Sequence, residues 1–374
     1  MDDFTYNVDD SFNQIINDII CIYHQHFGHS EANKIISILH KLVCLKKQYG
    51  RNHSSMPILL NSIGNSLAEN DLSNYSISFF LEQLRIEKHY LGNHHHDLVP
   101  TLNRIGEIYI ETHEILKAFD YFLESFAILN KSNKKGTIYA QTIYNIGLVQ
   151  YHQASYDDAF EIFDLAIMEQ RYAVRDYHPD VAKILVKVSD FQLEAGKLVD
   201  AMDNYSEALM IQKLVNGNMC VKVSDLLIKI GLIHKLKSEY NKSLNALNDA
   251  LNVVENLVDA TNSILVVLHE MCLIYQLIGD VQNTVKISKK IIDVITSNLG
   301  EKHICVALAL ALLRNIYIEN GMVESSETVS KEIKLLISGT GNQLHCIGND
   351  KFAMMVIELF GNEIDFIFQA AAAA

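Results

Sequence analysis

The feature that most restricts the fold is a repeat of 41 or 42 residues that recurs through seven successive copies. The copies align on one position, the anchor, and the residue directly before it is apolar every time. Six of the seven anchors are small, which is the residue type needed where two backbones approach closely. A fixed period in this range predicts a stack of similar units. The anchors are Gly64, Gly106, Gly147, Ser189, Gly231, Cys272 and Arg314.

Three further columns keep the same register. Sixteen residues after the anchor, four consecutive copies are aromatic (Phe80, Phe122, Phe163, Tyr205), and the last two copies have Ser288 and Ser330. Twelve residues after the anchor the residue is small, and seven after it stands a residue that ends helices or accepts left-handed backbone. These turn positions are Asp71, His113, Ala154, Gly196, Ser238, Gly279 and Gly321.

Each copy reads as two amphipathic helices around its turn. The copy at residues 178–212 is the best formed, with apolar residues at spacings of three and four in both halves. One such hairpin cannot bury both apolar faces, so it needs neighbours. The pattern therefore predicts an all-α chain of stacked helical hairpins.

The register also divides the chain. Residues 1–11 form a tail, residues 12–338 hold about eight hairpins, residues 339–350 form a loop, and residues 351–369 form an apolar helix. The eighth hairpin is a weaker first copy anchored near Ile20. The five alanines at 370–374 resemble a placeholder or tag remnant and are excluded from the fold.

Composition excludes several classes of function. The net charge is −14, and the 31 basic residues are scattered, so we expect no nucleic-acid partner. The longest apolar run, residues 304–313, is about half of the roughly 20 residues a membrane helix requires, so we expect no membrane span. The six cysteines contain no CxxC pair, which favours a cytoplasmic or other reducing intracellular location. No Lys or Arg precedes Lys34, so no leader is expected.

The small, aromatic and alanine columns resemble the tetratricopeptide repeat. The period of about 42 residues and the links LGNHHHDLV, YHPDVA and LGEKHICVA resemble kinesin light chain, in which a linker with a histidine joins successive hairpins. In these links, His96, His178 and His303 are expected to close a helix start. The resemblance implies a right-handed α-solenoid of about eight hairpins, with the C-terminal helix as a cap.

No motif for catalysis is present. The sequence has no phosphate loop, no GxSxG and no HExxH, so we expect no enzyme activity and no cofactor. His24, His26 and His29 lie close in sequence, and His94–His96 form a run, but residues two apart do not share a helix face. We expect no metal site.

The resemblance implies that the first helix of each hairpin lines a binding groove, at positions three and two before the anchor and one, four and five after it. Asparagine there can bond an extended peptide through one acceptor and two donors. A solvated face without a partner is the alternative. The predicted groove residues are Asn61, Asn65, Asn103, Arg104, Glu107, Tyr144, Asn145, Lys187 and Lys229.

The same positions become apolar toward the C-terminus. Apolar surface is costly to leave in water, at roughly 25 cal/mol per Å², so we expect a cover. Phe352, Met355, Leu359, Phe360 and Phe366 could supply it, either as an end cap, which we favour, or folded back along the groove. The predicted apolar groove residues are Val266, Leu273, Leu277, Leu308, Leu312 and Ile318.

These patterns predict a non-enzymatic scaffold or adaptor that binds a peptide or protein surface in its groove. Two alternatives stay open. High apolar content, 49% of residues, favours a permanent subunit of a large assembly. A regulatory region of a larger enzyme is also compatible, because such arrays are often joined to other domains.

Overall fold

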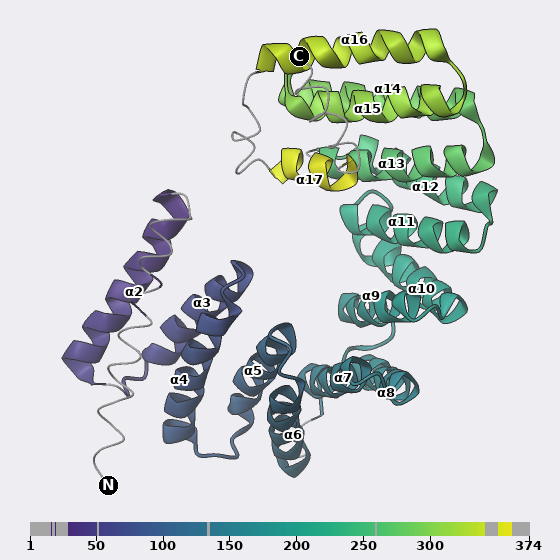
Figure 1. Ribbon diagram of the computed structural model, residues 1–374. Helices are drawn as coiled ribbons and strands as arrows, with labels where there is room; N and C mark the ends of the chain where they lie inside the picture. Colours follow the sequence, from purple (N-terminus) through teal and green to yellow (C-terminus); the bar gives the residue numbers. More distant parts are fainter. Residues whose placement is uncertain are drawn as a thin grey trace. The chain divides into compact units, whose positions relative to one another are not determined.

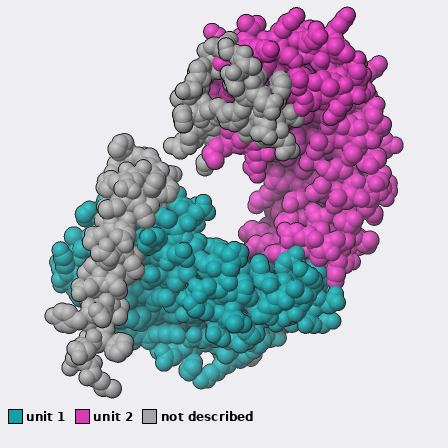
Figure 2. All heavy atoms as spheres, in the orientation of Figure 1, with its two compact units in different colours: residues 1–176 teal, residues 177–374 magenta. Residues whose placement is uncertain are grey.

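The computed structural model describes residues 16, 19, 29–50, 52–132, 135–258, 260–340 and 351–360. Within these residues it contains helices and no strand. The chain divides into two compact units, residues 1–176 and 177–374 (Figure 2). The boundary lies in a link between two hairpins, where the repeat register shows no interruption.

The first unit contains three complete hairpins and a preceding helix (Figure 1). In each hairpin the two helices pack on one another, and each hairpin packs on the next. The helices are α2 (His29–Tyr49), α3 (Met56–Glu69), α4 (Ser73–Leu91), α5 (Val99–Glu111), α6 (Ile115–Ser132), α7 (Thr137–His152) and α8 (Tyr156–Val174), with a 3₁₀ turn η1 (His96–Leu98) before α5.

The second unit contains four hairpins and a short last helix. Its helices are α9 (Pro179–Glu194), α10 (Leu198–Asn216), α11 (Val221–Leu236), α12 (Tyr240–Glu255), α13 (Thr261–Ile278), α14 (Val281–Leu299), α15 (Ile304–Glu319), α16 (Val323–Thr340) and α17 (Lys351–Phe360). Odd-numbered helices from α3 to α15 are the first helices of their hairpins, and even-numbered helices from α4 to α16 are the second.

The turn column is confirmed at all seven positions. Each has a positive φ, between 57° and 78°. Four of the seven are not glycine, so the chain accepts a strained backbone there to end one helix and start the next. The hairpin geometry is therefore maintained at these turns although the residue type changes.

The anchor column explains the aromatic column. A Cβ built on Gly106 would lie 2.4 Å from the Phe122 ring, and one on Gly64 would lie 2.6 Å from the Phe80 ring. The aromatic side chain of the second helix thus fills the space that the anchor leaves empty. Both phenylalanines are fully buried.

In later hairpins, other residue pairs make the contact between the anchor and the residue 16 positions after it. Gly231 faces Leu247, whose Cγ would lie 3.2 Å from an added Cβ. Cys272 Sγ lies 3.4 Å from Ser288 Oγ. In the last hairpin the larger residue is on the first helix, and Arg314 Nε donates to Ser330 Oγ over 2.9 Å. The loss of the aromatic column is therefore a change of partner at one contact.

A histidine begins four of the hairpins. Nδ1 of His53, His95, His178 and His303 accepts a hydrogen bond from the backbone N–H two residues later, at 3.2 or 3.3 Å. The prediction of this role for His178 and His303 is confirmed. The prediction for His96 is wrong, because the residue 11 before Gly106 is His95. His53 accepts the same kind of bond just before α3, whose N-cap is Ser55, and was missed.

Some of the predictions for the two ends of the chain fall on residues outside the described ranges. The first hairpin, with Ile20, lies there apart from the buried Ile16 and Ile19 and helix α2. So do residues 1–11, the loop at 341–350, the end of the last helix with Phe366, and residues 370–374. Two placements were left open for the last helix, an end cap and a helix folded back along the groove. The structure has the helix folded back, because α17 packs on α15 and α13, which are first helices (Figure 1).

Among the described residues, α13 is long and apolar enough to span a membrane by length and composition alone. Six of its residues belong to the hydrophobic core of the second unit: Leu265, Val267, Leu268, Met271, Cys272 and Ile274. The core helix of an array passes the same test, so the finding is weak evidence for a span.

Candidate protein-binding surface

The first helices present one face on which the predicted groove residues lie, and we call it the first-helix face. In the first unit, α3, α5 and α7 carry a connected set of hydrogen bonds on this face. Asn65 Nδ2 donates to Asn61 Oδ1 over 2.9 Å, and Arg104 Nε donates to Asn65 Oδ1 over 3.2 Å. Glu107 accepts from Arg104 Nη1 and from Asn145 Nδ2, both at 3.2 Å. We call these five residues the polar ladder.

The ladder changes how the predicted groove can act. Its five residues were predicted individually as contacts for a ligand, but the structure bonds them to one another. A ligand therefore has to exchange existing bonds, which reduces the net gain from each new one to roughly 1 kcal/mol. The ladder also ties neighbouring hairpins together through residues 38 and 39 apart.

Asn103, Tyr144 and Asn145 were expected on the groove surface, and the structure buries all three. Asn103 is 3% exposed, and its Nδ2 donates to Thr142 Oγ1 over 2.9 Å between α5 and α7. Tyr144 is 4% exposed, with its ring centroid 5.2 Å from that of Phe163. Asn61, which holds the place of Asn103 in the preceding hairpin, is only half-buried, so burial at these positions depends on the neighbouring hairpin.

The second unit repeats the bonding between neighbouring first helices with charges. Lys229 Nζ lies 2.9 Å from Asp190 Oδ1, and Lys235 Nζ lies 2.6 Å from Glu270 Oε2. Asp190 also accepts from the hydroxyl of Tyr205. Burial and the adjacent Asp190 carboxylate raise the pKa of Tyr205, so this hydroxyl stays a donor.

A cavity of about 280 Å³ opens between α9 and α11. Its apolar lining comes from Ala182, Val186 and Leu226. Four lysines surround this floor, and the predicted residues Lys187 and Lys229 are among them. The lysines lining this cavity, which we call the lysine cavity, are Lys183, Lys187, Lys222 and Lys229.

Asp225 is the acidic member of this cavity. Burial raises the pKa of its carboxyl, against the opposing effect of Lys229. Lys229 and Lys183 already have partners, since Lys183 Nζ lies 2.6 Å from Asp180 Oδ1. The cavity thus combines an apolar floor with cations held by exchangeable pairs. Lys183 and Lys222 were missed because they lie outside the groove columns that the resemblance implied.

The predicted apolar groove residues separate into three groups. Leu308 is buried, whereas Val266, Leu273 and Leu312 are half-buried. Leu277 and Ile318 are 59% and 48% exposed, so no helix covers them. Leu308 and Leu312 belong to the hydrophobic cluster that also contains α17.

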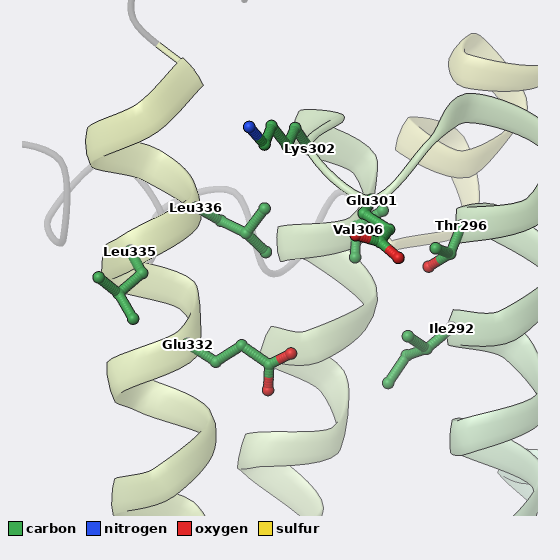
Figure 3. A pocket seen from close by; sticks show the side chains of 8 residues that line it. All are labelled: Ile292, Thr296, Glu301, Lys302, Val306, Glu332, Leu335 and Leu336. Atoms are coloured by element: carbon green, nitrogen blue, oxygen red, sulfur yellow. The ribbon is translucent and has the colours of Figure 1, made fainter.

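A larger cavity, of about 570 Å³, lies at the ends of α14, α15 and α16 (Figure 3). Leu335, Leu336 and Glu332 of α16 line one side, and Ile292 and Thr296 of α14 line the other (Figure 3). Glu301, Lys302 and Val306 complete the lining. Two carboxylates and one lysine line this cavity, whereas four lysines and one carboxylate line the cavity between α9 and α11.

Possible metal ligands come together at one place in the described part of the chain. Ligand atoms of His95, His96 and Asp97 lie within 4.8 Å of one another. His95 Nδ1 already accepts the backbone N–H of Asp97, which gives this histidine a structural role. His24 and His26 lie outside the described residues, as does the side chain of His29.

Comparison with known proteins agrees with the repeat assignment. No family model matches the sequence. Over 311 residues the chain is 20% identical to a protein of Arabidopsis thaliana named "kinesin light chain-related 3", and the match covers 82% of this chain and 48% of that protein. The chain therefore spans about half the length of this relative.

Solved structures with the same arrangement of helices include three similar chains. BtubC (BKLC) from P. vanneervenii has a TM-score of 0.52 at 16% identity, covering 60% of this chain and 90% of that one. The apo quorum sensor NprR from B. thuringiensis has a TM-score of 0.53 at 13% identity, covering 90% and 100%. A signal transduction ATPase with a tetratricopeptide repeat sensor from Pyrococcus horikoshii has a TM-score of 0.54 at 13% identity, covering 89% and 51%. The protein has the fold of an all-α solenoid of tetratricopeptide repeats, and its sequence is similar to that of a kinesin light chain-related protein.

Proposed function

We propose that the protein is a non-enzymatic scaffold that holds an acidic segment of a partner protein on the first-helix face of α9 and α11. The observation that carries this proposal is the lysine cavity. An apolar side chain of the segment fills the cavity of about 280 Å³, and carboxylates on either side pair with the surrounding lysines. The tetratricopeptide fold supports the general role, because its helices build extended binding surfaces.

The overall charge of −14 does not prevent an acidic segment from binding. At physiological salt, charges are screened beyond about 8 Å. At the cavity the segment meets Lys183, Lys187, Lys222 and Lys229, against the single lining carboxylate of Asp225. The distant acidic residues therefore slow the approach more than they weaken the bound state.

The exchange of partners supplies specificity. Lys229 must leave or share Asp190, and Lys183 must share Asp180, when a ligand carboxylate arrives. Both ion pairs are partly exposed, so each contributes roughly 1 kcal/mol or less and is readily exchanged. A neutral segment gains nothing from this exchange, which favours acidic ligands.

Fluorescence anisotropy tests the proposal with labelled peptides that carry one large apolar residue between aspartates. Binding should weaken at least tenfold for Lys187→Glu and for Lys229→Glu, and it should weaken as salt rises from 50 to 500 mM. Lys289→Glu, an exposed lysine on the second helix α14, is the matched control and should leave affinity unchanged. Equal binding of an asparagine-substituted peptide would contradict the proposal.

A permanent place in a larger assembly is the second candidate, and α8 favours it. Leu165, Met168 and Tyr172 lie on one face of this helix at spacings of three and four, and they are 42%, 57% and 83% exposed. Such a stripe on a second helix is a contact surface for another subunit. Met168→Glu with Tyr172→Glu should release the protein from its native complex in gel filtration of a cell extract. An unchanged elution volume counts against this candidate.

A further inference from the structure

The last helix covers the first-helix face at the C-terminal end of the second unit. α17 packs on α15 and on α13 (Figure 1). Three of its residues are buried in the core cluster, Ala353, Val356 and Phe360. They lie at spacings of three and four on one side of the helix. An amphipathic helix therefore lies in the place where the neighbouring hairpins present polar side chains.

The contact depends on shape and apolar area. Cys305 Sγ reaches the Ala353 carbonyl only at 3.8 Å, which is a weak hydrogen bond. The ring of His269 meets the ring of Phe360 edge to face, with centroids 5.2 Å apart and planes at 87°. Phe352, Met355 and Leu359 pack on the cluster at the margins. A helix from another molecule with the same three buried residues would make the same contacts.

The helical form of α17 depends on packing. In proteins, most of the stability of an amphipathic helix comes from the packing of its apolar face. Its helical form therefore depends on the surface formed by α13 and α15. Residues 341–350 join it to α16, and a link of this length gives an effective concentration in the millimolar range.

We infer that the first-helix face of α13 and α15 is a helix-binding site, that α17 is its ligand in cis, and that it accepts in trans an amphipathic helix. The incoming helix has a small, an aliphatic and an aromatic residue at the spacing of Ala353, Val356 and Phe360. His269 selects the aromatic residue, because its ring and the Phe360 ring meet in a T-shaped contact. This site is separate from the lysine cavity, since it takes an apolar helix where the cavity takes an acidic segment.

Competition between the two helices sets the affinity. An incoming helix must overcome the millimolar effective concentration of α17, so it binds the intact protein only when its own contact is the stronger one. Loosening α17 should therefore reveal the site without any change to α13 or α15. Met354 and Glu358 are exposed on the opposite side of α17 and offer control positions.

The test measures anisotropy of a labelled peptide with the sequence of residues 351–360, added to full-length protein. The protein with Phe360→Ala in its own α17, and separately with Val356→Asp, should bind the peptide at least tenfold more tightly than the unchanged protein or the Met354→Asp control. A peptide with aspartate in place of the valine should not bind. Adding His269→Ala to the Phe360→Ala protein should weaken binding of the natural peptide and spare a peptide with leucine in place of the phenylalanine.

Two results would overturn the inference. The Phe360→Ala protein could keep its melting curve and yet bind no peptide at millimolar concentration. Alternatively, the peptide could bind all variants equally, which would place its site elsewhere. Lys187→Glu, which tests the lysine cavity, should leave peptide binding unchanged, so the two proposals fail separately.

Discussion

The first-helix face is built in two ways at the two ends of the described chain. In the first unit the polar ladder of α3, α5 and α7 bonds to itself, with Arg104 and Glu107 at its centre. In the second unit, Leu273 of α13 and Leu312 of α15 stand at ladder positions, one after and two before the anchor, and α17 packs across the two helices. A polar face satisfies itself locally, whereas an apolar face needs a separate segment to cover it. The same repeat thus supports both an open face and a covered one.

The hairpin interiors differ along the same direction. Gly106 with Phe122 represents the earlier hairpins, and Cys272 with Ser288 or Arg314 with Ser330 the later ones. In each pair the two side chains occupy one shared space. In these two later hairpins, a larger anchor side chain contacts the serine that stands in the place of the aromatic residue.

The covered face should be the more easily broken. Val356→Asp places a carboxylate in the cluster that contains α17, and a buried unpaired charge is among the most costly changes. We expect a loss of about 3 kcal/mol in the free energy of unfolding, measured by urea titration with circular dichroism. Met354→Asp, on the exposed side of the same helix, should change it by less than about 0.5 kcal/mol. Equal effects would mean that α17 does not cover this face.

The interior difference can be tested by exchange of the contact pair. Gly106→Cys places atoms where the Phe122 ring lies, and we expect a loss of about 2 kcal/mol. Adding Phe122→Ser reproduces the pair of Cys272 and Ser288 and should recover part of this loss. Thermal melting of the single and double variants provides the measurement. A double variant less stable than the sum of both single changes would show that the pairs are not interchangeable.

The polar ladder can be broken at its centre. Glu107→Ala removes the acceptor of Asn145 Nδ2, and Asn145 is fully buried, so its amide would lose its partner. We expect a loss of about 1 to 2 kcal/mol in urea unfolding. Glu111→Ala, at an exposed carboxylate 3.7 Å from Arg104, is the control and should cost much less. A smaller loss for Glu107→Ala than for its control would disprove the ladder as a stabilising element.

A fall in pH should destabilise the face that α17 covers, and this is the smallest of the four predicted effects. Burial lowers the pKa of His269, the nearby Glu270 raises it and Lys235 lowers it. The folded state thus favours the neutral ring, so its contribution is present above the ordinary pKa of about 6.5 and is lost as pH falls through the lower folded value. Between pH 7 and 5 the unfolding free energy of the unchanged protein should fall by up to about 1 kcal/mol more than that of His269→Gln. A parallel fall in both proteins would exclude this histidine.

The repeat register predicted the hairpins well because their columns follow from local backbone needs. The turn at Ala154 has a φ of 61° without glycine, and only its place seven residues after the anchor identified it. The small residue at Ala118 is fully buried, as its column required. Such features depend on residues within one hairpin, which a sequence pattern records directly.

The face was predicted less well because it depends on contacts between hairpins. Asn103 was placed on the surface, but its neighbour Thr142 belongs to the next hairpin and turns it inward. The bond from Asn145 to Glu107 crosses 38 residues, and no local pattern encodes it. For α17, the sequence shows an apolar side without naming the surface that it meets. The slip from His95 to His96 was instead an error of one residue in alignment.

The hydrogen bonds of the polar ladder also couple ligand binding to the stiffness between hairpins. A ligand group that binds the Arg104 guanidinium breaks its hydrogen bond to Asn65 on one neighbouring hairpin. It also releases Glu107 from Arg104, so that Glu107 can bond more closely to Asn145 on the other neighbouring hairpin. Occupancy at one hairpin would thereby alter the stiffness between its two neighbours. Each hydrogen bond of the ladder then acts as an elastic link, and a bound segment would change the flexibility of the array one repeat away from where it binds.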